Sequence, residues 1–206
     1  MIFAPAAETD FPALVDLVNS AYRGQGAQAG WTTEAGYIDG QRIDLDSLRQ
    51  DLADSPNAIL LTLRDEQEGP LLGCVWLEPD GDIPDGKAWY LGMLTIRPDL
   101  QDRKLGAALL AHGEAYARDH GAQRIRMTVV HLRDTLIAWY QRRGYTLTGE
   151  RKPFPVGERF GKPQQALEFV VLEKGLLERA RQVTTCRDPR PGLFCPAPRP
   201  RQSVRR

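Results

Sequence analysis

A polar turn ahead of an apolar helix pattern is the first place in this sequence where residue types and spacing point to chemistry. The segment Gln101–Lys104 is followed by the small residues Gly106 and Ala107 near the expected helix start. The first backbone amides of a helix have no partner within it, and the helix dipole adds roughly half a positive charge there. Small residues let a bulky ligand approach the backbone, and Arg103 and Lys104 can bind phosphate oxygens. We therefore expect a phosphate-bearing ligand at this turn.

The turn matches neither of two common nucleotide-binding patterns. It is not GxxxxGK[ST], which cradles the phosphates of nucleoside triphosphates, and it is not GxGxxG, which binds dinucleotides. These two ligand classes are therefore poor candidates. The alternative interpretation of the turn is a solvated helix start, because polar N-terminal turns are common.

The cysteines and histidines predict no metal site. Cys74, Cys186 and Cys195 have no CxxC spacing and no nearby histidines, so we expect neither a disulfide framework nor zinc. Cys74 lies in a strand pattern and is most simply a small buried hydrophobic residue. His112 and His120 fall on the helix after the polar turn, where we interpret them as packing and surface residues.

The elements that must position the turn follow from the hydrophobic pattern. Asp10 can cap a helix that ends near Gly24, and a short second helix is expected over 46–53. Three apolar runs bounded by turn residues predict a hairpin and then a central strand, since the last run is apolar on both faces. These three strands are expected at 58–63, 71–77 and 89–96.

The second half of the pattern alternates helices and strands. A helix is expected over 104–120 with Gly121 as its stop, and the shorter helix around 136–140 is ended by Gly144. Three further apolar patterns predict strands, of which the first alternates apolar and polar residues as a half-buried strand does. These strands are expected at 124–130, 146–151 and 166–172.

Composition and length bound the class of protein. The 206 residues suffice for one well-buried domain, and the formal net charge of +0 provides no global field for nucleic acid or an anionic membrane. We find no basic leader and no long apolar segment, so we expect no signal peptide, no membrane span and a cytoplasmic location.

The chain changes character after Gly175. Residues 176–206 are rich in Arg and Pro, and we expect a helical stub followed by disorder rather than part of the domain formed by residues 1–175. Arginines in such a tail are usually solvated. The alternative, nucleic-acid binding through the tail, predicts salt-sensitive affinity for DNA that is lost on truncation.

Two stretches resemble motifs of the GNAT superfamily of acyl-CoA-dependent N-acetyltransferases. The run from Gln101 to Gly106 resembles motif A, [QR]-x-x-G-x-[GA], with Lys104 in place of the middle glycine. Tyr140, four residues before the pair Gly144-Tyr145, holds the position of the motif B tyrosine. The asparagine often found seven residues before that tyrosine is Arg133 here.

The resemblance covers about residues 1–175 and implies the fold, an α/β arrangement. It is a mixed twisted sheet of about six to seven strands flanked by helices, with a V-shaped splay between two central parallel strands. It also implies acetyl-CoA as co-substrate and no metal. In this reading the pantetheine arm pairs with the first strand of the V, and the pyrophosphate rests on the amides of the polar turn. The implied cofactor-binding residues are Leu94, Thr95, Ile96, Gln101, Asp102, Arg103, Lys104, Leu105, Gly106 and Ala107.

The implied reaction is direct attack of a primary amine of a small molecule or peptide on the thioester carbonyl. Tyr140 is the implied catalytic residue, which donates a proton or hydrogen bond to the departing sulfur. Its alternative interpretation is a core aromatic residue on an amphipathic helix. No Glu or Asp lies in 89–96 to act as base. The candidates left for that role are His131 and a water molecule that passes the proton to a distant carboxylate.

The acceptor is expected between two loops that flank one side of this fold. The aromatic residues of these loops are acceptor-binding candidates, and two carboxylates could attract a cationic amine. The candidates are Trp31, Tyr37, Phe154 and Phe160, with Asp39 and Asp44 as the carboxylates. A catalytically weak or inactive CoA-binding sensor or partner module is the alternative function, and relatives often form homodimers.

Overall fold

The computed structural model describes residues 1–24, 30–83, 85–155, 157 and 161–176. Phe160 and residues 177–206 of the expected C-terminal stub and tail lie outside these residues, whereas Leu176 corrects the expected boundary of the domain after Gly175. Leu176, the last described residue, packs into the core and donates its backbone N–H to the carbonyl of Gln123 over 2.8 Å.

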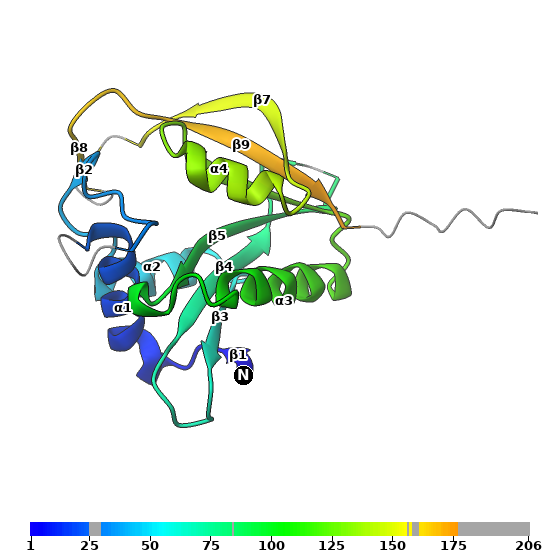
Figure 1. The fold of residues 1–206 in the computed structure, drawn as a ribbon. Helices are drawn as coiled ribbons and strands as arrows, with labels where there is room; N and C mark the ends of the chain where they lie inside the picture. Colours follow the sequence, from blue (N-terminus) through cyan, green and yellow to red (C-terminus); the bar gives the residue numbers. More distant parts are fainter. Residues whose placement is uncertain (25–29, 84, 156, 158–160, 177–206) are drawn as a thin grey trace, which may run out of the picture.

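Seven strands form one mixed sheet (Figure 1). They are β1 (Ile2–Pro5), β3 (Ile59–Arg64), β4 (Gly73–Pro79), β5 (Ala88–Ile96), β6 (Arg124–Val130), β7 (Thr146–Pro153) and β9 (Glu168–Gly175). The order across the sheet is β1-β3-β4-β5-β6-β9-β7, which confirms the central place predicted for β5. A separate two-stranded sheet pairs β2 (Ile38–Asp39) with β8 (Lys162–Pro163).

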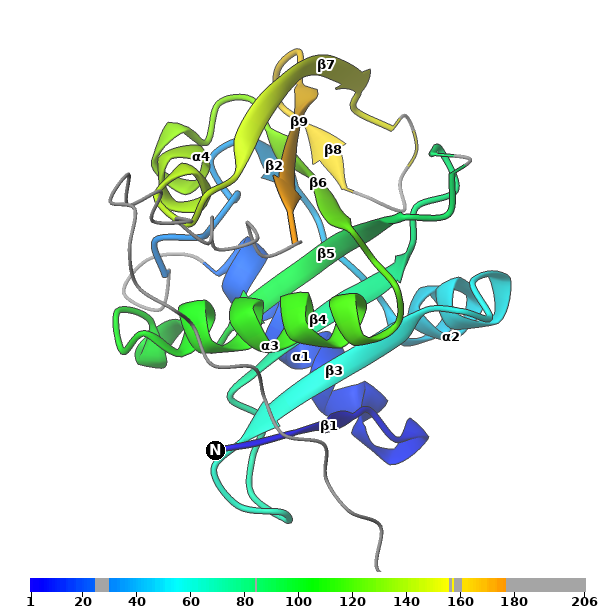
Figure 2. The ribbon, with the colours of Figure 1, turned by 90° about the vertical axis from the view of Figure 1, so that its right-hand side faces the viewer.

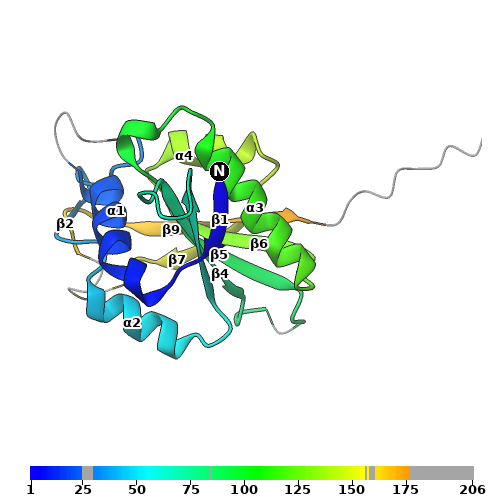
Figure 3. The same ribbon diagram turned by 90° about the horizontal axis from the view of Figure 1, so that it is seen from below.

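Two helices cover each face of the main sheet (Figure 3). They are α1 (Phe11–Arg23) and α2 (Leu45–Asp54) on one face, and α3 (Leu105–Asp119) and α4 (Asp134–Gln141) on the other. The strands divide their side chains accordingly, because successive residues point to opposite faces. Cys74 and Trp76 pack with the residues of α1 and α2, whereas Val75 and Leu77 pack with those of α3 and α4. Short 3-10 turns precede α1 and α3, at Glu8–Asp10 and Pro98–Leu100.

Three features of the fold differ from the sequence prediction. β1 was not expected, because a segment of four residues that ends in proline is too short to show the alternation of apolar and polar residues that predicts a strand. The same holds for the two-residue strands β2 and β8. Asp10 does precede α1, but its carboxylate accepts hydrogen bonds from the backbone of Ala7 at 3.1 Å and from Arg64 at 2.6 Å instead of capping the helix.

The central strands β5 and β6 form the predicted V. They run parallel and pair only over Ala88–Tyr90, opposite Arg124–Arg126. Beyond Tyr90 they separate, as Figure 2 shows, while β5 stays paired with β4 along its other edge. The β4–β5 register shifts within this part of the sheet, where Met93 has a φ of +50°. A bulge here changes the direction of β5 where it leaves β6.

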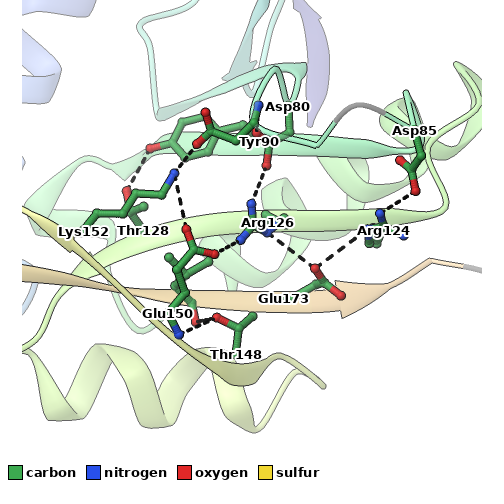
Figure 4. A network of polar contacts seen from close by, with 12 residues as sticks. Asp80, Asp85, Tyr90, Arg124, Arg126, Thr128, Thr148, Glu150, Lys152 and Glu173 are labelled. Atoms are coloured by element: carbon green, nitrogen blue, oxygen red, sulfur yellow. Dashed lines mark hydrogen bonds and ion pairs between the residues drawn. The ribbon is translucent and has the colours of Figure 1, made fainter.

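A buried arginine fastens the closed end of the V (Figure 4). Arg126 is paired with Tyr90 at the last shared position of β5 and β6, and its side chain is 6% exposed. It contacts Asp80 at 3.2 Å, Glu173 at 3.5 Å, and Glu150. These carboxylates come from the end of β4, from β9 and from β7, so one guanidinium ties four segments together where the strands divide.

The turn between β5 and α3 contains two residues in the left-handed region. Asp102 has a φ of +68° and Lys104, which precedes α3, a φ of +64°. This conformation suits glycine and costs other residues roughly 1 kcal/mol. It gives a physical reason for the glycine that motif A usually has at the position of Lys104.

We predict that Arg126→Leu lowers the free energy of unfolding by about 3–5 kcal/mol, because it leaves the carboxylates around a buried guanidinium without their partner. Urea unfolding measures the change. Arg124→Leu is the matched control on the same strand, since its side chain is 29% exposed and its ion pairs are more accessible to solvent. The control substitution should lower the free energy of unfolding by less than about 1 kcal/mol. Equal losses for the two variants would contradict the assigned role.

We predict that Lys104→Gly stabilises the protein by about 1 kcal/mol, since glycine adopts the left-handed conformation without strain. Thermal unfolding is the measurement. Arg103→Gly is the control, because the backbone at Arg103 is outside the left-handed region and glycine there only adds entropy to the unfolded chain. A loss of stability in Lys104→Gly would show that the turn carries no such strain.

Candidate active site

Two adjoining cavities lie where β5 and β6 diverge. The turn cavity, of about 220 Å³, lies against the β5–α3 turn and one side of α4. The strand cavity, of about 200 Å³, lies between the separated parts of β5 and β6. The two cavities share five lining residues, so they meet. The shared residues are Tyr22, Leu94, Arg133, Leu136 and Tyr140.

Most of the residues proposed from motif A line the turn cavity. These residues are Leu94, Ile96, Gln101, Asp102, Lys104, Gly106 and Ala107. Three others of that set do not line it. Thr95 is buried on the side of Cys74 and donates to the Met93 carbonyl at 2.9 Å, Leu105 packs against the core, and Arg103 is exposed. Their side chains therefore contribute no wall to this cavity.

Gly106 keeps the turn cavity open next to the first turn of α3. A Cβ placed on it would lie 3.6 Å from atoms of both Ile96 and Trp139, which themselves line the cavity. A longer side chain at this position would therefore enter the space between β5 and α4. The helix has its unpaired amides here, and Lys104 and Arg143 add positive charge to the wall.

The strand cavity exists because β5 and β6 separate. Its two long walls are Tyr90–Leu94 of β5, which begins at the last paired residue of that strand, and Met127–Val130 of β6, which follows the last paired residue Arg126. Tyr90 and Thr128 bridge the walls, with 3.1 Å between their hydroxyl oxygens (Figure 4). Beyond this bridge, the facing edges of β5 and β6 no longer form backbone hydrogen bonds with each other. The main-chain N–H and C=O groups on these edges are therefore available to a ligand.

Tyr140 lies at the junction of the two cavities. Trp139 and Tyr145 hold its ring by edge contacts, at centroid distances of 5.0 and 5.6 Å. No described residue forms a hydrogen bond with its hydroxyl. Burial raises the pKa of Tyr140, and raises that of the neighbouring Tyr22 to about 12. Both phenols therefore stay protonated at neutral pH, and Tyr140 can donate a hydrogen bond into either cavity.

Gln101 fastens the loop before β2 to the turn. Its side-chain oxygen accepts from the Trp31 backbone at 2.9 Å, and its nitrogen donates to the Thr32 hydroxyl at 2.8 Å. On the other side, Arg133 donates to the carbonyl of Thr32 at 2.6 Å and to Glu34 at 2.8 Å. The motif residue Gln101 and the unexpected Arg133 thus hold one loop from two directions.

Glu34 is the centre of a buried ion cluster in the strand cavity wall. It is 6% exposed and binds Arg23 at 2.7 Å with one oxygen and Arg133 at 2.8 Å with the other. Buried charges of this kind are stable only when paired, so the cluster fixes α1, the loop and the start of α4 relative to one another.

The structure separates the residues proposed for the acceptor. Phe154 lines the strand cavity, whereas Trp31 lines the turn cavity, where its ring is 6.4 Å from that of Trp139. Tyr37 packs in a small core cluster and lines neither cavity. Phe160 lies outside the described residues.

The polar candidates for acceptor binding or base catalysis lie elsewhere. Asp39 accepts a hydrogen bond from Gln164 at 2.8 Å, and Asp44 caps α2 by accepting from Ser47 at 2.7 Å. His131 is hydrogen-bonded through its Nδ1 atom to the backbone of Glu168 at 3.1 and 3.2 Å. None of the three lines the turn cavity or the strand cavity.

Several wall residues were not predicted from the sequence. Tyr22 and Trp139 lie on helices whose pattern is only amphipathic. Arg143 lies in the turn after α4 and stacks on the Trp139 ring, with 3.5 Å from its Cζ to the centroid. Glu34 lies in a glycine-rich loop without a pattern. The aromatic content of that loop was the one signal that it borders a site. In the described part of the chain, no three His, Cys, Asp or Glu side chains form a group that could hold a metal ion.

No described helix is long and apolar enough to cross a lipid bilayer. A mycothiol acetyltransferase of Stackebrandtia nassauensis is 30% identical over 135 residues, which cover 65% of this chain and 40% of that protein. A second one, from Cellulomonas flavigena, is 30% identical over 89 residues, 40% of this chain and 26% of the relative. The chain thus matches less than half the length of these curated relatives.

Solved structures share the fold at low sequence identity. The ribosomal-protein-alanine N-acetyltransferase of Brucella melitensis has a TM-score of 0.62 and 20% identity, over 85% of this chain and 99% of that one. The yncA protein of Salmonella typhimurium, solved with its cofactor acetyl-CoA, has a TM-score of 0.61 and 20% identity, over 87% and 96%.

A family model matches the part of the chain that contains the V between β5 and β6, the polar turn and Tyr140. The model of the Acetyltransferase (GNAT) family matches residues 27–145, more than half of the chain, and that range contains β5, the polar turn, α3 and α4. This chain therefore belongs to the GNAT acetyltransferase family.

Proposed function

We propose that this protein transfers the acetyl group of acetyl-CoA to a primary amine of a small molecule by direct attack. The observation that carries the proposal is the position of Tyr140, whose buried phenol lies where the turn cavity and the strand cavity meet. One cavity then holds the coenzyme and the other the acceptor. The bond exchange takes place between them.

The residues of the turn cavity fit a coenzyme with a diphosphate. The free amides of the first turn of α3, the small Gly106 and the cations of Lys104 and Arg143 favour phosphate oxygens. The separated edge of β5 near Leu94 offers main-chain groups to the amide-containing pantetheine arm. Acetyl-CoA supplies an activated thioester, so the protein has mainly to position the partners and stabilise developing charge.

Tyr140 donates a proton or hydrogen bond to the departing sulfur in this proposal. Its raised pKa keeps the donor protonated, and the dry surroundings strengthen the interaction. Glu34 is the one carboxylate among the described residues that line the strand cavity, and two arginines hold both of its oxygens. We therefore infer that the amine gives its proton to solvent rather than to a carboxylate of this wall.

We predict that Tyr140→Phe lowers kcat by about 100-fold and leaves the Kd for coenzyme A within about twofold, because only the departing sulfur needs the hydroxyl. Thiol release across a panel of amines and calorimetry with coenzyme A are the measurements. The ratio of wild-type to variant kcat should stay constant from about pH 7 to about pH 10, since the raised pKa keeps the phenol protonated there.

Tyr145→Phe is the control for this prediction, because its hydroxyl binds Glu114 at 2.9 Å and lines neither cavity. It should leave kcat nearly unchanged. Equal losses of rate and coenzyme affinity in Tyr140→Phe would overturn the role of the phenol. Coenzyme binding without turnover of any amine would favour the sensor function instead.

We predict that Gly106→Glu weakens coenzyme A binding by at least about tenfold, because bulk and negative charge enter the phosphate end of the cavity. Gly106→Ala is the matched variant, since a Cβ there makes only ordinary contacts at 3.6 Å. It should fold and keep most of the affinity. Undiminished binding by a folded Gly106→Glu protein would place the coenzyme elsewhere.

A further inference from the structure

Tyr22, near the end of α1, brings a second phenol to the junction of the two cavities. It lines both the turn cavity and the strand cavity, as Tyr140 does. Tyr22 belongs to α1 and Tyr140 to α4, and these helices lie on opposite faces of the sheet (Figure 3). The open end of the V therefore receives one phenol from each face.

The Tyr22 hydroxyl forms no hydrogen bond with any residue that the structure describes. The main chain of Tyr22 is held in place, because its carbonyl accepts from the backbone N–H of Glu34 at 2.7 Å and from Arg23 at 3.3 Å. A phenol can donate one hydrogen bond, and buried donors are rarely left without a partner. The Tyr22 hydroxyl is thus placed to donate to a bound molecule.

The two phenols differ in this respect from the other side chains at the junction. The remaining described residues that line both cavities are two leucines and Arg133. The terminal nitrogens of Arg133 already donate to Glu34 at 2.8 Å and to the Thr32 carbonyl at 2.6 Å. Among the described residues shared by the cavities, the phenols are therefore the side-chain donors that remain for a ligand.

Both phenols keep their protons at neutral pH. Burial, and after it the nearby carboxylate of Glu34, raises the pKa of Tyr22 to about 12. Burial also raises the pKa of Tyr140, and the neighbouring Tyr22 phenol raises it further, so the two groups interact. Two neutral donors at one junction can stabilise two atoms that gain negative charge in the same reaction.

Acetyl transfer places negative charge on two atoms bonded to one carbon. When the amine nitrogen bonds to the acetyl carbon, the π electron pair of the carbonyl group moves to its oxygen. This pair re-forms the carbonyl bond as the carbon–sulfur bond breaks, and the sulfur leaves with the electrons of that bond and takes the proton of Tyr140. Solvent accepts the proton that the amine loses and returns one to Tyr140. The sulfur thus has a donor, and the oxygen needs another.

We propose that Tyr22 is a second catalytic residue, whose hydroxyl donates a hydrogen bond to the carbonyl oxygen of the acetyl group while Tyr140 acts on the sulfur. This rests on the proposed function and adds a donor to it. Tyr22 keeps its proton throughout, because the hydrogen bond alone stabilises the charge on the oxygen. The competing donors are the main-chain N–H groups on the open edge of β5.

Isotope-edited infrared difference spectroscopy tests this hydrogen bond without an acceptor. Acetyl-CoA labelled with ¹³C at the carbonyl is bound to the protein, and its C=O stretch is compared with that of the free coenzyme. A hydrogen bond weakens the C=O bond, so the stretch should lie at lower frequency in the wild-type complex. Tyr22→Phe should return it most of the way to the free value, whereas Tyr140→Phe and Tyr145→Phe should keep the wild-type frequency. An equal shift in the wild type and Tyr22→Phe would assign the oxygen to the main chain and overturn the proposal.

Tyr22→Phe should also lower kcat by about 100- to 1000-fold with an amine that the wild type acetylates, as loss of an oxyanion donor does. The Kd for coenzyme A, which has no acetyl carbonyl, should stay within about twofold. Thermal unfolding checks the fold, which the substitution should preserve because it removes no hydrogen bond to a described residue. A higher KM for the amine at unchanged kcat would assign Tyr22 to acceptor binding and overturn the proposal.

Failure of the proposed function gives a different result. Acetyl-CoA would then bind with the shifted C=O stretch, but no amine would release the thiol, which would keep the hydrogen bond and remove the catalytic role of Tyr22. Absence of acetyl-CoA binding would overturn both proposals.

Discussion

The parallel pairing of β5 and β6 over three residues each is the constraint on which the rest of the structure depends. Because the pairing stops at Tyr90 and Arg126, the sheet is closed at one end and open at the other. Antiparallel neighbours hold the outer edges of both strands, so the strands cannot close the gap without losing the β4 and β9 ladders. The gap is therefore a permanent part of the fold, and its walls include unpaired main-chain groups that a ligand can satisfy.

Charged side chains stabilise both ends of this V in different ways. At the closed end, Arg126 gathers carboxylates from three other segments, so strands that are distant in sequence stay together where the sheet divides. At the open end, Glu34 lies between two arginines, and Gln101 binds the same loop from the β5–α3 turn. Both arrangements bury ions that are paired, so each fixes the segments it joins relative to one another.

Most of the elements and most of the residues that line the turn cavity could be predicted from the sequence, because their signals are local. β6 was predicted over its full length, since Arg124–Val130 alternates between one apolar face and one polar face. The residues of the polar turn are also contiguous in the sequence, so their types and spacing alone predict a phosphate-binding turn. Thr95 and Leu105 are adjacent in sequence to residues that line the turn cavity, but their own side chains point away from it. The alternation of side chains along β5 and the helical rotation of α3 direct them into the core.

The charged wall of the strand cavity could not be predicted in the same way. Arg23, Glu34, Arg42 and Arg133 come from a helix end, two loop positions and the residue before α4, and only the fold brings them to one wall. Arg133 was visible as a departure from motif B, yet its partner Glu34 lies 99 residues away and no local pattern connects them. Interactions of this kind depend on tertiary contacts that periodicity does not encode.

The most direct test of the account is a crystal structure of the protein in complex with coenzyme A. The account predicts the diphosphate against the first turn of α3, the pantetheine arm along the open edge of β5, and the sulfur within about 3–4 Å of the Tyr140 hydroxyl. A coenzyme bound outside the turn cavity, or a sulfur remote from Tyr140, would contradict it.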